Sequence, residues 1–210
     1  MGDLLAVLGG GGIGRSIVER AREQGYDVAV LDLPASLAAH PAPEGTLCIA
    51  VDATQDEQVA EAARTLREHK RTLMGFVNTC GFLTQRVPTL ETPPDDWSVT
   101  LEGNLSSAFY SARHFAPLIS QGGSMVMTGS GLGASPRPDY GAYAVAKAGI
   151  AALTRQLALE LAPNLRVNCV PPVKKAVSTA EGATQLTRRF GASSSANCRV
   201  RAAMPALATA

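Results

Sequence analysis

Short apolar runs alternate with amphipathic, helix-like stretches along most of this chain. The apolar runs are five or six residues long, as buried strands usually are, and we predict strands at 4–8, 27–31, 46–51, 75–79, 124–128 and 165–170. Helical periodicity predicts helices at 15–24, from 54 to about 70, from about 95 to about 119, and at 142–161. Strands that alternate with helices are typical of an α/β fold with a parallel sheet.

Length and composition suit one globular domain. The chain has 210 residues, 46% of them hydrophobic, and a formal net charge of +1, which is enough chain for a sizeable core. No apolar run approaches the ~20 residues of a membrane span. The start, Met-Gly-Asp-Leu-Leu-Ala, has an acid where a signal peptide carries basic residues. We therefore expect a cytoplasmic protein that does not act on a membrane.

Cysteines and histidines are too scattered to suggest a disulfide framework or a metal site. Neither type shows the close spacing of a redox or zinc motif, and cysteines beside apolar runs usually act as small buried hydrophobes. These residues are Cys48, Cys80, Cys169, Cys198, His40, His69 and His114. We predict no metal.

A glycine-rich turn joins the first predicted strand to the first predicted helix. Gly9, Gly11 and Gly14 follow the G-x-G-x-x-G spacing, with Gly12 and Ile13 inside it. This spacing lets the backbone turn sharply, approach a pyrophosphate and present it to the N-terminus of a helix. Four consecutive glycines can also form a simple flexible turn, but the position between a strand and a helix favours a dinucleotide site.

Two aspartates follow the second and third predicted strands. Asp32 comes eighteen residues after Gly14, where an acid binds the ribose hydroxyls of NAD and repels the 2′-phosphate of NADP. The alternative for Asp32 is a turn or helix-capping role. Asp52 precedes Thr54-Gln55-Asp56-Glu57, which we interpret as a capping box, so Asp52 can belong to that turn. NAD is the favoured cofactor and NADP the less favoured one.

A second polar group lies between the apolar run at 124–128 and the helical run at 142–161. Tyr143 and Lys147 are four residues apart, so in a helix they share one face. A fixed ammonium favours the phenolate form of a nearby phenol, which makes that phenol useful as a general acid or base. Ser130 follows the apolar run and can hold a substrate oxygen. A tyrosine and a lysine at this spacing also occur by chance on solvated helix faces.

Together these residues resemble the signature of the short-chain dehydrogenase/reductase family, a Tyr-x-x-x-Lys helix with a serine thirteen positions before the tyrosine. Ser130 and Tyr143 have that separation. The resemblance implies that Tyr143 moves the substrate proton, that Lys147 assists it and also binds the cofactor, and that Ser130 orients the substrate oxygen. It also implies that Asn104 distorts its helix and holds a water in a proton relay; an ordinary polar position on an amphipathic helix is the alternative.

The resemblance covers residues 4–172. Asn78 and Gly81 match the family's Asn-Asn-Ala-Gly segment beside the nicotinamide ribose, Asp52 matches an adenine contact, and Leu-Arg-Val-Asn-Cys-Val at 165–170 is similar to a family strand. It implies a Rossmann-type doubly wound parallel sheet of about six strands in the order 3-2-1-4-5-6. We therefore predict one α/β domain over residues 1–172 that carries both the cofactor site and the catalytic residues.

Three departures from the family pattern bear on function. The glycine turn is one residue short, and Leu8 stands where the family has a threonine whose hydroxyl braces the turn. Thr79 and Cys80 replace the two middle residues of the family's Asn-Asn-Ala-Gly. Residues 173–210 show neither a lid helix nor a seventh strand, and they hold six basic residues against one acidic residue. Such an Ala/Ser-rich tail lacks interleaved aromatics, so we expect a poorly ordered end and no nucleic-acid partner.

The sequence thus predicts an oxidoreductase that transfers a hydride between NAD(H) and a small alcohol or ketone. One alternative is a dinucleotide-binding protein with little or no turnover, because the lid and last strand are missing. Another is a relative of sugar-nucleotide epimerases, which needs a much longer C-terminal part. The helix at 142–161 is apolar on more than one side, and a homodimer or homotetramer would cover it. The residues that select the substrate lie in variable loops, so its identity is left open.

Overall fold

Six parallel strands form one sheet in the order β3-β2-β1-β4-β5-β6, which confirms the predicted topology. The structure is a computed structural model that describes residues 2–69 and 71–172, so the expected tail at 173–210 lies outside the described residues. The strands are β1 Leu4–Leu8, β2 Asp27–Asp32, β3 Leu47–Ala50, β4 Leu73–Asn78, β5 Ile119–Thr128 and β6 Arg166–Val170.

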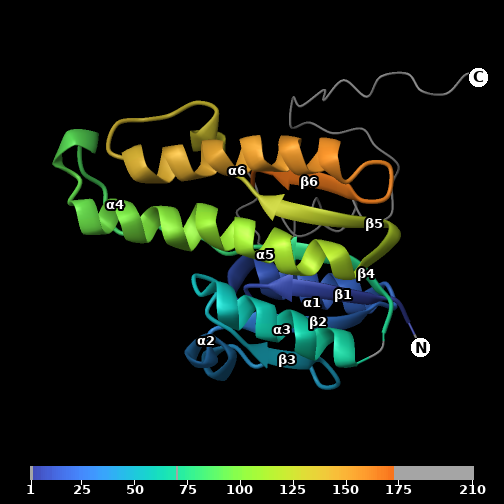
Figure 1. Ribbon diagram of the computed structural model, residues 1–210. Coiled ribbons are helices and arrows are strands. Elements are labelled where there is room, and N and C mark those ends of the chain that lie inside the picture. The colour runs from blue at the N-terminus through green and yellow to red at the C-terminus, as the bar shows by residue number, and fades with distance from the viewer. Residues whose placement is uncertain (1, 70, 173–210) are drawn as a thin grey trace, which may run out of the picture.

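Helices cover both faces of this sheet (Figure 1). They are α1 Gly12–Glu23, α2 Pro34–Ala39, α3 Asp56–Glu68, α4 Pro94–Leu101, α5 Ser107–Phe115 and α6 Gly141–Glu160. Short 3₁₀ turns lie at η1 Thr89–Glu91, η3 Ala116–Leu118 and η4 Gly131–Gly133, and a π-helical turn, η2 Glu102–Ser106, joins α4 to α5.

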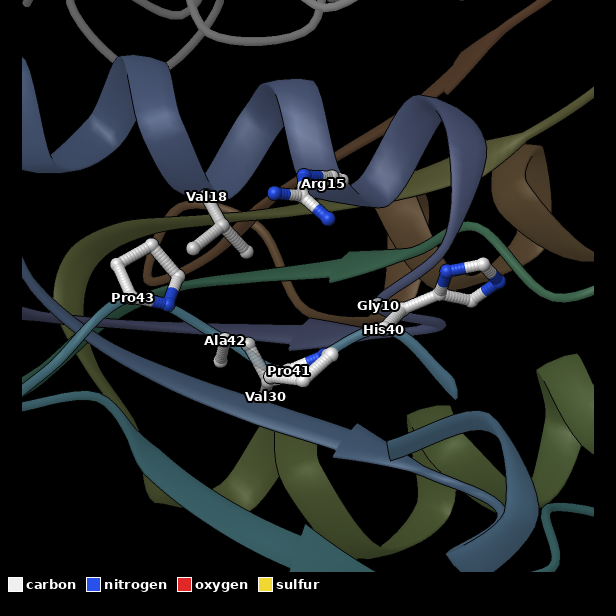
Figure 2. A pocket seen from close by; sticks show the side chains of 8 residues that line it. All are labelled: Gly10, Arg15, Val18, Val30, His40, Pro41, Ala42 and Pro43. Atoms are coloured by element: carbon white, nitrogen blue, oxygen red, sulfur yellow. The ribbon is translucent and has the colours of Figure 1, made fainter. Parts of the chain in front are cut away.

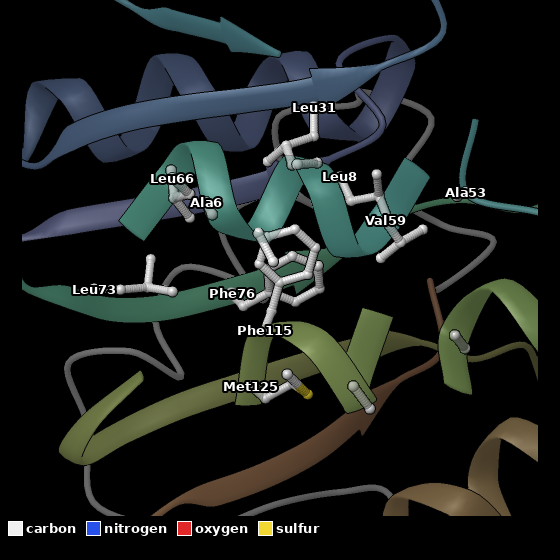
Figure 3. Close-up of a cluster of buried hydrophobic side chains, with 14 of the residues drawn as sticks. Ala6, Leu8, Leu31, Ala53, Val59, Leu66, Leu73, Phe76, Phe115 and Met125 are labelled. Atoms are coloured by element: carbon white, nitrogen blue, oxygen red, sulfur yellow. The ribbon is translucent and has the colours of Figure 1, made fainter. Parts of the chain in front are cut away.

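Alternate residues of the strands pack into two separate cores, one on each face of the sheet, because successive side chains of a strand point to opposite faces. Leu4, Ala6 and Leu8 of β1 face the larger core, which α3, α5 and α6 cover, while Leu5 and Val7 face a smaller core under α1. In the larger core the rings of Phe76 and Phe115 stack on each other (Figure 3). Their centroids are 4.6 Å apart. Because β1 is buried on both faces, its sequence is continuously apolar.

Two local predictions between residues 34 and 57 are wrong. Residues 34–39, for which the sequence predicted neither a helix nor a strand, form α2, because Pro34 at the first helical position already has a helical φ. The predicted capping box at 54–57 does not form. The Thr54 hydroxyl instead donates to Asp52 Oδ1 at 2.8 Å, and α3 begins at Asp56 without a side-chain cap.

The helix expected from about 95 to about 119 is shorter and interrupted. Its middle is the π-helical turn η2, and its end at Phe115 gives way to η3 and then to β5, which begins at Ile119. The early part of β5 contains the pair Gly122-Gly123. Gly122 has φ +82°, and the pairing of β4 with β5 shifts register in this region, so the irregularity is a bulge inside a longer strand.

All strands are parallel, so their carboxyl ends meet at one edge of the sheet. The chain crosses over in opposite directions on the two sides of β1, which pairs with both β2 and β4. Folds of this kind bind ligands in the crevice at such a switch point. The glycine turn after β1, Asp32 in β2 and the segment after β4 all lie at this edge.

Candidate active site

The glycine turn after β1 brings two backbone segments into contact that no side chain can separate. A Cβ on Gly14 would lie 1.7 Å from the carbonyl oxygen of Gly9, and Gly9 itself has φ +94°. Helix α1 begins at Gly12 with Gly11 as its N-cap, three residues earlier than the sequence predicted. Glycine is therefore required at 9 and 14 for the fold of the turn.

The same turn fits a dinucleotide pyrophosphate. A Cβ on Gly12 would meet nothing within 4 Å, and no side chain caps the N-terminus of α1 within the described residues. The N–H of Gly14 donates to the carbonyl of Gly11 at 2.9 Å, which leaves those of Gly12 and Ile13 available to an anion at the positive end of the helix dipole. An anion can approach this backbone closely.

A threonine from a different strand braces the turn. Thr79, the residue after β4, has its hydroxyl oxygen 2.9 Å from the carbonyl oxygen of Leu8 and 2.9 Å from that of Gly9. Sequence comparison with the family pattern suggested that a bracing hydroxyl is lost where Leu8 replaces threonine. The structure does have a hydroxyl at this turn. It belongs to Thr79, which follows β4, and not to the residue at position 8 in β1.

Asp32 at the end of β2 is tied to the glycine turn and to α2. Its Oδ2 accepts the backbone N–H of Gly10 at 2.7 Å and the hydroxyl of Ser36 at 2.6 Å, and its Oδ1 accepts the N–H of Leu33 at 2.8 Å. The turn role that the sequence left open is therefore present. These three donors also hold the carboxylate beside the phosphate turn, so the ribose role stays a compatible prediction.

Asp52 makes the turn contacts that were its alternative role. Its Oδ1 accepts the N–H and the hydroxyl of Thr54 at 2.9 and 2.8 Å, and its own N–H donates to Gln58 Oε1 at 3.0 Å. These bonds shape the entry into α3. Contact with adenine stays a prediction for this residue.

Asn78 and Gly81 border the turn that follows β4. The buried Asn78 accepts the N–H of Cys80 through Oδ1 at 2.8 Å, and its backbone carbonyl accepts the hydroxyl of Thr128 at 2.8 Å. Gly81 has φ +150°, and a Cβ there would lie 2.5 Å from Asn104 Oδ1 and 2.8 Å from Lys147 Nζ. The chain must therefore have glycine where these two polar groups meet.

Asn104 enters the helical ladder with its side chain. Its Nδ2 donates to the carbonyl of Thr100 one turn earlier at 2.9 Å and to that of Phe82 at 2.8 Å. An amide inserted in this way widens the turn, which accounts for the π-helical segment at 102–106. Asn104 Oδ1 is buried and has no hydrogen-bond partner within the described residues. It presents a free acceptor beside Lys147 Nζ.

Lys147 is the most deeply buried charged side chain of the site, only 2% exposed. Its Nζ donates to the carbonyl of Thr128 at 3.1 Å and lies 5.5 Å from the centroid of the Tyr143 ring. Burial lowers the pKa of the Lys147 ammonium to about 8. The predicted shared face of Tyr143 and Lys147 is therefore present, and the lysine is in a low-dielectric setting.

Ser130 is attached to the same helix through a short turn. It caps η4, where its Oγ accepts the N–H of Leu132 at 3.2 Å. A Cβ on Gly133 of this turn would lie 2.7 Å from the backbone carbon of Lys147, so η4 packs directly on α6. This close approach brings Ser130 and η4 against α6, the helix that carries Tyr143 and Lys147.

Two loops meet beside the first turn of α6 and border the approach to these residues. The backbone of Val87 bridges that of Tyr140, and the Arg86 guanidinium lies 4.8 Å from the centroid of the Tyr140 ring. Phe82, 44% exposed, packs its ring against Gly103. Sequence reasoning placed substrate selection in these loops but identified neither Arg86 nor Tyr140, because their contact joins residues far apart in the chain.

A small hollow lies beside the glycine turn (Figure 2). Arg15 and His40 border it, and its walls are otherwise mostly apolar: Gly10, Val18, Val30, Pro41, Ala42 and Pro43.

Within the described part of the chain, no three His, Cys, Asp or Glu residues gather as metal ligands would. No helix among the described residues is both long and apolar enough to cross a bilayer.

The depressed pKa of Lys147 predicts how stability depends on pH. The folded pKa of about 8 is below the ordinary 10.5, so between these values the unfolded chain binds more protons and wild-type stability rises with pH. Relative to Lys147→Met, the wild type should gain about 3 kcal/mol over this window. Urea unfolding of both proteins at pH 7, 9 and 10.5 measures the difference.

Lys147→Met serves as the reference because the titration of a second group, the Cys80 thiol, changes the stability in the opposite direction. Burial raises the pKa of the Cys80 thiol to about 12 from an ordinary 9.0, which lowers stability above pH 9 in both proteins. A difference between wild type and Lys147→Met that stays constant across the three pH values would contradict a buried, destabilised ammonium.

Comparisons with known proteins agree with this geometry. A family model described as enoyl-(acyl carrier protein) reductase matches residues 7–206. A short-chain type dehydrogenase/reductase of Picea abies is 30% identical over 191 residues, 82% of this chain and 70% of that protein. An NAD-dependent glycerol dehydrogenase of Listeria innocua is 30% identical over 179 residues, with 81% and 70% covered.

A solved short-chain dehydrogenase/reductase of Serratia marcescens superposes with a TM-score of 0.78 at 28% identity, covering 90% of this chain and 89% of that one. The family match continues past residue 172, further than the motifs in the sequence predicted. The family indicated by these matches is also consistent with the strand order, the glycine turn and the Tyr143–Lys147 pair. The chain belongs to the short-chain dehydrogenase/reductase family, whose members are oxidoreductases that use nicotinamide dinucleotides.

Proposed function

We propose that this protein transfers a hydride between NAD(H) and the alcohol or carbonyl carbon of a small molecule. The observation that carries the proposal is the buried Lys147 ammonium, which lies 5.5 Å from the Tyr143 ring centroid and against Gly81 beside the free Oδ1 of Asn104. A buried cation next to a phenol, at the carboxyl edge of a dinucleotide-binding sheet, suits proton transfer coupled to hydride transfer.

Each residue of the set has one task in the oxidation of an alcohol. A bound NAD supplies the hydride acceptor. The Tyr143 phenolate takes the hydroxyl proton as the substrate C–H bond breaks, and the Lys147 ammonium stabilises that phenolate. Ser130 donates a hydrogen bond to the substrate oxygen and keeps it near Tyr143. Carbonyl reduction runs the same steps in reverse, with Tyr143 returning the proton to the oxygen.

Asn104 and Lys147 support proton exchange with solvent. Asn104 is held by two carbonyl acceptors through Nδ2, so its Oδ1 points in one fixed direction beside Lys147 Nζ. A buried acceptor without a protein partner is a place for a bound water. In the proposed relay, that water passes the proton between Lys147 and the outside after each turnover.

NAD is the proposed cofactor in preference to NADP. The Asp32 carboxylate is held beside the glycine turn by Gly10, Leu33 and Ser36, where it can accept ribose hydroxyls and repel a 2′-phosphate. The Listeria innocua relative is named as NAD-dependent, which supports the same choice. Arg15, on the other side of the turn, is paired with Glu19 at 3.1 Å, so its charge is partly neutralised.

A homodimer or homotetramer is the proposed assembly. Large apolar side chains on α4, α5 and α6 are about half exposed or more: Val99 45%, Phe109 46%, Val145 48% and Leu159 62%. Pairing of these helices with those of a second copy would remove this apolar surface from water.

Binding and turnover of the wild-type chain test the proposed function. We expect NADH to bind at least about tenfold more tightly than NADPH, since one unfavourable charge contact of about 1.4 kcal/mol or more separates them. The measurement is titration of NADH fluorescence, followed by absorbance at 340 nm with ketones, keto acids and acyl thioesters. Tight NADH binding without turnover on any of them would instead indicate a dinucleotide-binding protein that does not catalyse. No binding of either dinucleotide would refute the proposal.

A further inference from the structure

We propose that the Thr79 hydroxyl is the positioning group that holds the shortened glycine turn in the shape that binds the dinucleotide. The inference rests on the proposed function, because it assigns a role in cofactor binding. It concerns a residue that does not react and that reaches the turn from a neighbouring strand.

The hydroxyl lies at the centre of the turn. Its oxygen is 2.9 Å from the carbonyl oxygens of both Leu8 and Gly9, so one proton is shared between two acceptors. A Cβ on Gly9 would lie 2.4 Å from this oxygen and one on Gly14 would lie 3.1 Å from it. The first and last glycines of the motif therefore close around the Thr79 hydroxyl.

This contact compensates for both departures of the turn from the family pattern. Leu8 has no hydroxyl; its side chain is 1% exposed and belongs to the larger core. The turn is one residue short, and the Thr79 hydroxyl occupies the space between its first and last glycines. Thr79 stands where the family has asparagine, so this bracing hydroxyl is a feature of the present chain.

The bond also joins the two parts of the crevice that one dinucleotide must span. Thr79 is preceded by Asn78 and followed by Cys80 and Gly81, which lie against Asn104 and Lys147. Its backbone N–H donates to the carbonyl of Leu8 at 2.8 Å, parallel to the hydroxyl bond. The phosphate turn and the segment beside the catalytic lysine are thus fixed to each other through one residue.

Thr79→Val, Thr79→Ser and the control Thr154→Val test this role. Valine replaces the hydroxyl by a methyl that would lie 2.9 Å from two carbonyl oxygens, closer than the 3.3 Å or more of ordinary carbon–oxygen contacts. Serine keeps the hydroxyl. Thr154 is a buried threonine in α6 whose hydroxyl also donates to a carbonyl, that of Ile150 at 2.8 Å, so its valine variant loses a comparable bond away from the turn.

We expect Thr79→Val to raise the Kd for NADH about tenfold, and Thr79→Ser and Thr154→Val to stay within about twofold of wild type. Hydrogen–deuterium exchange of the peptide covering residues 8–16 should be about tenfold faster in Thr79→Val and unchanged in Thr154→Val. This second readout needs no ligand.

The possible outcomes separate this proposal from the proposed function. If Thr79→Val binds NADH as tightly as wild type, or its turn exchanges no faster, Thr79 is not the brace. Equal weakening by Thr154→Val would reduce the effect to general stability and overturn the proposal as well. If wild type binds no dinucleotide, the proposed function fails, while the exchange rates of residues 8–16 still decide whether Thr79 holds the turn.

Discussion

Replacement of Tyr143 by phenylalanine should lower kcat about 10²- to 10⁴-fold, the usual contribution of a general acid or base. The phenyl ring keeps its position on α6, 5.5 Å from Lys147 Nζ in the wild type, so the fold and the cofactor site are preserved. The Kd for NADH should therefore change by no more than about twofold. Steady-state kinetics with the best substrate of the carbonyl panel and NADH titration measure the two effects separately.

Tyr110→Phe is the matched control, because it removes a phenol hydroxyl from α5, where the ring packs against the larger core. It should leave kcat close to the wild-type value. Full turnover by Tyr143→Phe would remove the proton-transfer assignment. A loss of kcat shared equally by Tyr110→Phe would show that stability, and not chemistry, limits the measured rate.

Replacement of Gly14 by alanine should have the second largest effect, a rise of about 10- to 100-fold in the Kd for NADH. The new Cβ would lie 1.7 Å from the carbonyl oxygen of Gly9 and 2.8 Å from its carbonyl carbon, so the turn must open. Overpacking of a tight site costs about 1–3 kcal/mol, and 1.4 kcal/mol corresponds to tenfold in affinity. The melting temperature should also fall, since β1 and α1 are joined by this turn.

The control for this substitution is Gly131→Ala in η4, where a Cβ would meet no atom within 4 Å. It introduces the same methyl group into a second glycine-containing turn and should leave both affinity and melting temperature unchanged. NADH fluorescence titration and thermal unfolding monitored by circular dichroism are the measurements. Unchanged affinity in Gly14→Ala would mean that the close backbone approach at Gly9 is not needed for binding.

Several elements were predictable because their signals are local or depend on burial alone. The six apolar runs predicted the strands, most directly for β1, which is buried on both faces and must therefore be apolar throughout. Tyr143 and Lys147 share a face because helix geometry brings residues four apart together. The glycine spacing predicted the phosphate turn, because only glycine tolerates the approach of Gly14 to Gly9.

Local signals failed where two nearby interactions compete. At 54–57 the hydroxyl of Thr54 had two possible partners, the helix N-terminus and the Asp52 carboxylate, and it bonds to the carboxylate. Around 102–106 the sequence has ordinary helical periodicity. The π-helical turn there comes from Asn104, whose amide bonds to Phe82 across the site as well as to Thr100 in its own helix. Periodicity shows neither choice, and the distortion of the helix at Asn104, which the structure confirms, was predicted only from the family resemblance.

By itself the sequence of this protein determined where the six strands lie along the chain, the glycine turn and the spacing of Ser130, Tyr143 and Lys147, since these depend on neighbours along the chain. The tertiary structure alone decided which polar groups meet. The Thr79 hydroxyl bonds to carbonyls 71 and 70 residues earlier in the chain. Lys147 in α6 donates to the carbonyl of Thr128 in β5. Such contacts form only after β1, β4 and β5 pair in register, and only this pairing surrounds Lys147 with enough apolar atoms to lower its pKa.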